Sequence, residues 1–69
     1  MNEWIAARAR ALGVDDLQPD EIATLLDLAG HAAHESGART NAPLLCYLVG
    51  RAQGERSLAE LEEIVRSTS

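Results

Sequence analysis

Apolar side chains recur along most of this chain at helical spacing, and no stretch alternates as a half-buried strand would. One run differs from the rest, because residues 44–49 (Leu-Leu-Cys-Tyr-Leu-Val) are six consecutive apolar residues. On a helix, such a run places apolar side chains on nearly every side. The pattern therefore predicts a central apolar helix that other elements cover.

Capping and stop signals predict two helices in the first half of the chain. The first covers about residues 3–12, with Asn2 as a cap residue and Gly13 as its end. The second covers about residues 19–35, opens with a proline at the first helical position and stops near Gly37. The stretch between these helices is expected to be a connector.

Two more helices are predicted in the second half. The third covers about residues 42–53, with Thr40 or Asn41 as its cap. The fourth covers about residues 58–66 and begins with a capping-box pattern at Ser57. The fold class predicted from these signals is all-α, with one domain over residues 1–69 and three to four short helices packed compactly around the central apolar helix.

Helical periodicity also assigns side chains outside the central run to the core. Residues at these positions are Trp4, Ile5, Ala11, Leu12, Val14, Leu17, Ile22, Leu25, Leu26, Ala29, Ala32, Ala33, Leu58, Leu61, Ile64 and Val65. Two glycines, Gly30 and Gly50, lie inside predicted helices, where glycine costs about 1 kcal/mol relative to alanine. They either permit a close approach by a neighbour or are tolerated for packing.

Composition narrows the class of partner. Eleven acidic residues against six arginines give a net charge of −5, which disfavours binding to nucleic acid and to anionic membranes. The single cysteine, Cys46, lies in the apolar run and is expected to be a buried, unreactive thiol. No basic leader opens the chain and no apolar run is long enough to span a bilayer, so a cytoplasmic location is expected.

A polar stripe on the second helix is the first candidate site. Asp27, His31 and His34 are separated by four and three residues, so they share one side of a helix, and Glu35 follows one turn after His31. With the core placed at Ile22, this stripe faces solvent. Two imidazoles and a carboxylate can bind a divalent metal, but a second helix would have to supply further ligands and the sequence shows none. A solvated face with local ion pairs is the favoured interpretation, and no metal or cofactor is expected.

The loop that follows carries two further candidate residues, Arg39 and Asn41. An arginine beside a helix N-terminus can bind an anion such as a phosphate or a carboxylate. An arginine that is only solvated in a loop would give the same sequence pattern. No catalytic residue is predicted. The only serine at a helix start, Ser57, is explained by its capping role, and no serine, histidine and acid fall in a catalytic arrangement.

The order of several short motifs resembles a small domain of unknown function from high-GC Gram-positive bacteria. The motifs are Glu3-Trp4-Ile5, Leu12-Gly13, Leu26-Asp27-Leu28-Ala29, Ala33-His34, Arg39, Ala42-Pro43-Leu44 and Tyr47-Leu48-Val49-Gly50. That family occurs alone or fused to nucleotidyltransferases that attach a guanine nucleotide to the molybdenum cofactor. The chain departs from it in the more polar residues 35–37 and 40–41 around Arg39.

The resemblance implies a non-enzymatic accessory role in molybdenum-cofactor biosynthesis, through contact with a protein such as a nucleotidyltransferase. The polar residues of this chain that match the motifs of that family are Asp27, His34 and Arg39. Two alternatives remain: a small metal- or nucleotide-binding domain that uses the polar stripe, and a structural dimerisation module. The size of the chain also favours a dimerisation module, because 69 residues lie near the lower limit at which a chain can form a stable core by itself.

Overall fold

The computed structural model describes residues 2–68, and these form four helices and no strand. The helices are α1 (Glu3–Leu12), α2 (Pro19–Ser36), α3 (Asn41–Gln53) and α4 (Leu58–Ser67). Each agrees with its predicted range to within one residue at either end. The all-α fold class is confirmed.

Local capping explains where α1 begins and ends. The Asn2 side-chain oxygen accepts a hydrogen bond from the Ile5 N–H at 3.1 Å, which satisfies one of the first backbone donors. At the other end Gly13 has a φ of 74°, a left-handed conformation that only glycine adopts cheaply. The Val14 N–H then donates to the Ala9 carbonyl at 3.0 Å, which closes the helix with a Schellman-type turn.

Capping at the other helices is uneven. The Glu21 carboxylate accepts from the Gln18 N–H at 2.8 Å at the start of α2. The Ser57 hydroxyl accepts from the Glu60 N–H at 3.2 Å at the start of α4, as predicted. Thr40 is the cap residue of α3, but its side chain makes no capping hydrogen bond. Helix α3 therefore depends more on packing than on its own N-terminal signal.

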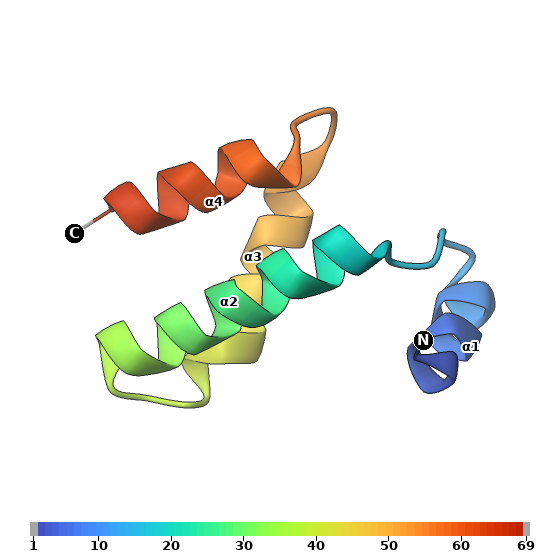
Figure 1. The fold of residues 1–69 in the computed structure, drawn as a ribbon, viewed down its shortest axis with the longest axis horizontal. Coiled ribbons are helices and arrows are strands. Elements are labelled where there is room, and N and C mark those ends of the chain that lie inside the picture. The colour runs from blue at the N-terminus through green and yellow to red at the C-terminus, as the bar shows by residue number, and fades with distance from the viewer. Residues whose placement is uncertain (1, 69) are drawn as a thin grey trace.

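Three of the helices pack together and one stands apart. Helix α4 runs alongside α2 in the same direction, and α3 crosses behind them (Figure 1). The pairs α2–α3, α2–α4 and α3–α4 are all in contact. Helix α1 lies at the other end of the molecule and packs closely against none of the other three helices (Figure 1).

One residue from each packed helix forms the centre of the core. These residues are Leu28 on α2, Val49 on α3 and Leu61 on α4, and Leu28 is fully buried. Leu45, Leu58 and Val65 pack around them and are partly buried. No buried side-chain nitrogen or oxygen among the described residues lacks a hydrogen-bond partner.

The expectation that the apolar run of residues 44–49 is covered on all sides is wrong. Val49 is buried and Leu45 and Cys46 are half-buried, but Leu44, Tyr47 and Leu48 are exposed. Helices α2 and α4 both lie on one side of α3, so the opposite side of α3 has no neighbour.

The core assignment for α1 and the connector is also wrong, except at Ile5, which is half-buried. Trp4 is 64% exposed and Leu12 is 76% exposed, and Val14 and Leu17 are exposed as well. In α1 the buried residues are instead Ala6 and Ala9, and neither belongs to the Leu28 cluster. The large side chains stay outside because no other helix covers the outer face of α1.

On α2 the buried face is rotated from its predicted position. Leu28, absent from the expected core, is the most buried residue, whereas Leu26 is 68% exposed. Ile22 marks the edge of the buried face because α3 and α4 contact α2 on the side of Leu28 and Ala32. A close approach at the mid-helix glycines is not supported, since Gly30 and Gly50 are exposed and a Cβ at either position would meet no atom within 4 Å. These surroundings agree with the other explanation for Gly30, that the glycine is simply tolerated.

The exposed area is large for the size of the chain. A folded monomer of 7.4 kDa is expected to expose roughly 4,200 Å². This chain exposes 5436 Å², an excess of about 1,200 Å² by the same scaling. No helix within residues 2–68 has the length and apolar character to cross a membrane.

We expect Leu28→Ala to lower the free energy of unfolding by about 2–5 kcal/mol, because it opens a cavity among three helices. The matched control is Leu26→Ala on the same helix, which should change stability by no more than about 0.5 kcal/mol because Leu26 is exposed. Urea unfolding followed by circular dichroism measures both. Equal losses would contradict the assignment of the buried face of α2.

We expect Ser57→Ala to cost about 0.5–2 kcal/mol, because the Glu60 N–H loses its side-chain acceptor. Thr40→Ala should cost much less, since the Thr40 side chain makes no capping bond. Thermal unfolding of the two variants at equal concentration measures the difference. A larger loss for Thr40→Ala would show that α3, not α4, depends on its cap.

Candidate functional site

The five predicted site residues fall on the second half of α2 and the loop beyond it. Asp27 and His34 lie on exposed turns of α2, Arg39 is exposed in the α2–α3 loop, and Asn41 is the half-buried first residue of α3. His31 is half-buried, so the prediction that the whole stripe faces solvent is wrong at this residue. It lies only about 60° around the helix from Leu28, at 100° per residue, because the buried face centres on Leu28 rather than on Ile22.

These residues are not joined into a site. Within residues 2–68 the one ion pair is between Glu62 and Arg66 of α4, with 3.2 Å between the Glu62 Oε2 and the Arg66 Nε. The two residues are one helical turn apart, the spacing at which such pairs form on a helix surface. In the same part of the chain no three histidine, cysteine, aspartate or glutamate side chains gather closely enough to hold a metal ion. The polar stripe therefore has the spacing of a metal site on one helix but not the second set of ligands.

Cys46 is a nucleophilic side chain beside the core. It is half-buried on α3, and its Sγ lies 3.9 Å from the Leu25 carbonyl oxygen of α2. A thiol is a weak donor to such a carbonyl, and the contact is part of the α2–α3 packing. Among the described residues it belongs to no cluster of three or more histidine, cysteine or acidic side chains.

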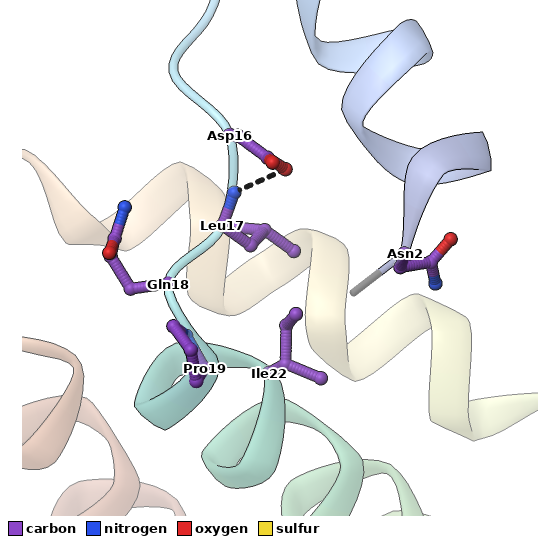
Figure 2. A pocket seen from close by; sticks show the side chains of 6 residues that line it. All are labelled: Asn2, Asp16, Leu17, Gln18, Pro19 and Ile22. Atoms are coloured by element: carbon purple, nitrogen blue, oxygen red, sulfur yellow. Dashed lines mark hydrogen bonds between the residues drawn. The ribbon is translucent and has the colours of Figure 1, made fainter.

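A hollow of about 390 Å³ lies where α1 approaches the start of α2. Its lining residues are Asn2, Asp16, Leu17, Gln18, Pro19 and Ile22 (Figure 2). Two of its polar groups are already engaged in local structure: the Asp16 carboxylate accepts from the Leu17 N–H at 2.8 Å, and Asn2 caps α1. With no nucleophile or second ionisable group among the six, the hollow is a gap beside the connector rather than a catalytic cleft.

The exposed face of α3 is the feature that sequence reasoning missed. Leu44, Tyr47 and Leu48 are three and four residues apart, so they form one face, and each is more than half exposed. The Arg51 guanidinium lies 5.7 Å from the centre of the Tyr47 ring at the end of this face. The sequence did contain a signal for this exposed face. A helix that is apolar on every side is buried only if other elements pack on every side, and a chain of this length has too few helices to do so.

An apolar groove continues from this face toward α4. Leu48 of α3 and Ile64 of α4 are its exposed edges, and Val49, Leu61 and Val65 lie deeper between the two helices. Its volume is about 240 Å³. Exposed apolar surfaces of this kind mark binding to other proteins more often than catalysis.

Comparison with known proteins bears on the family of the chain. No curated protein and no solved structure matches the chain. One family does match, and it covers residues 1–69, the whole of the sequence. The chain therefore belongs to the family described as domain of unknown function DUF6457.

Proposed function

We propose that this chain is a non-enzymatic protein-interaction domain of the cytoplasm, and that the exposed face of α3 meets its partner. The observation that carries the proposal is the exposure of Leu44 and Tyr47, which lie on one side of a helix whose other side is packed. Aromatic and apolar side chains with an adjacent arginine are the residues on which protein interfaces depend most. Arg51 over Tyr47 completes that combination.

Arg39 and Asn41, two of the candidate polar residues, fit the edge of such an interface better than a pocket. Asn41 is three residues before Leu44 on α3, and Arg39 precedes it in the loop. Exposed charges at the edge of an interface steer association and set specificity while adding little affinity. Arg39 is suited to a carboxylate of the partner, whereas Asp27 and His34 lie on α2, which packs against the other side of α3.

We propose a nucleotidyltransferase of molybdenum-cofactor synthesis as the partner. The support is the resemblance of the ordered motifs, from the Leu26-Asp27-Leu28-Ala29 segment to the Tyr47-Leu48-Val49-Gly50 segment, to a domain fused to such enzymes in high-GC Gram-positive bacteria. A domain that occurs fused to an enzyme in one protein and alone in another often binds that enzyme when it is separate. The acidic charge of −5 suits a basic surface on the partner.

Titration of the chain into a purified molybdenum-cofactor guanylyltransferase tests the proposal. We expect saturable binding that weakens at least about tenfold in Leu44→Glu, because a carboxylate would be buried without a partner in the interface. Leu26→Glu is the matched control, since Leu26 is just as exposed but lies on α2, and its binding should stay near that of the wild type.

Two results would contradict the proposal. No binding by the wild-type chain removes the nucleotidyltransferase as partner, and equal weakening in Leu44→Glu and Leu26→Glu removes the α3 face as the site. Circular dichroism of both variants checks that the fold is retained.

A further inference from the structure

The α3 surface, which is the exposed face of α3 together with the α3–α4 groove, carries arginines at one end. The exposed face finishes at Arg51, whose guanidinium lies 5.7 Å from the centre of the Tyr47 ring. Among the described residues, Arg56 is the one charged residue that lines the groove. Neither arginine forms an ion pair within residues 2–68. Two positive charges therefore lie beside an exposed apolar surface.

The α3 surface differs in charge from the rest of the chain. Residues 36–54 include all of α3 and contain two arginines and no acidic residue. The eleven acids behind the net charge of −5 lie in residues 3–35 and 55–63, and none of them is among the described residues that line the groove. The local charge at the α3 surface is therefore positive although the whole chain is acidic. Charge complementarity favours an acidic occupant.

The position of the α4 acids limits where an acidic occupant can place its charges. Ile64 is the exposed edge of the groove on α4. At 100° per residue, Glu60 and Glu63 lie farther around the helix from the buried Leu61 than Ile64 does, so they face away from the groove. The acidic residues of the occupant therefore belong at the C-terminal end of α3, beside Arg51, and its apolar residues belong along α4.

The shape of the α3 surface suits a helix. From Leu44 through Leu48 to Arg51 it spans about two helical turns, or roughly 10 Å, and the groove beside it holds about 240 Å³. The described residues form no strand, so they offer no sheet edge for an extended peptide to join. An amphipathic helix places apolar side chains three and four residues apart into such a groove. Helix α4 already packs against α3 in this way, with Leu61 buried and its acids outside.

A second copy of this chain is a poor occupant. Two α3 faces brought together would place arginines from both copies in one interface with no acid from either helix. Helices α2 and α4 already bury their apolar sides in their own core. Helix α1 has two arginines and one glutamate, so it is also positive. Charge therefore favours a different protein.

We propose that the α3 surface binds an amphipathic helix of the partner whose acidic residues meet Arg51 and Arg56. That helix covers the side of α3 that α2 and α4 leave open (Figure 1). Basic residues elsewhere on the partner would meet the other faces of this chain, where its acids lie. The inference rests on the proposed function, because it gives the chemistry of the segment that the α3 face binds.

Titration of the full chain with two synthetic peptides tests the charge of the occupant. Both peptides are amphipathic, with leucines three and four residues apart. One carries two glutamates at one end of the apolar face, and the other carries glutamines there. At low salt we expect the glutamate peptide to bind about three- to tenfold more tightly, because it gains two partly exposed ion pairs. Non-specific attraction would give the opposite order, since the chain has a net charge of −5.

Replacing both arginines, Arg51→Gln with Arg56→Gln, should abolish the preference for the glutamate peptide. Measuring both peptides on both proteins forms a double-mutant cycle, which cancels any difference in helicity between the free peptides. Arg10→Gln is the matched control and should keep the preference, because Arg10 is an exposed arginine on α1, away from α3. Leu44→Glu should weaken both peptides at least about tenfold by placing a carboxylate in the apolar face. Circular dichroism shows whether each variant is folded.

Equal binding of the two peptides, binding of neither, or a preference that survives the loss of both arginines would overturn the proposal. A dimer of the chain that Leu44→Glu dissociates, and with which the glutamate peptide does not compete, would overturn it as well. The titration with the guanylyltransferase separates this inference from the proposed function. Enzyme binding through Leu44 without a peptide preference keeps the proposed function and overturns the acidic helix. A peptide preference without enzyme binding keeps the acidic helix and removes the nucleotidyltransferase as partner.

Discussion

The contact among Leu28, Val49 and Leu61 is the interaction on which the fold depends. Each of the three packed helices places one apolar side chain there, and partly buried leucine and valine neighbours surround it. Helix caps set where each helix begins and ends, but a short helix is marginal in water without an apolar face packed against another element. The relative positions of α2, α3 and α4 therefore follow from this small cluster.

So small a core cannot cover every apolar side chain in the chain. Helix α1 remains outside the packed group, and α3 has neighbours on one side only. The uncovered side chains lie at helical spacing on two surfaces, one on α1 and one on α3 that continues into the groove beside α4. Surfaces of this kind are typical of a domain that completes its core by binding other protein surfaces.

The described residues offer no comparable support for chemistry. The polar residues of α2 share one side of a helix without a second set of ligands, and the polar groups of the hollow beside α1 are engaged in caps and turns. Membership of a family of unknown function adds no activity to this picture.

Backbone signals in the sequence determined where α1, α2 and α4 begin. Asn2, Pro19 and Ser57 mark helix starts, Gly13 and Gly37 mark helix ends, and these effects act within a few residues of each position. The sequence likewise determined the spacing that places Asp27, His31 and His34 along one helix. It did not determine which side of α2 is buried, nor that Leu44, Tyr47, Trp4 and Leu12 remain exposed. Tertiary structure decided those points, because burial depends on which helices meet, and in this chain α1 meets none of the others while α2 and α4 reach α3 from one side.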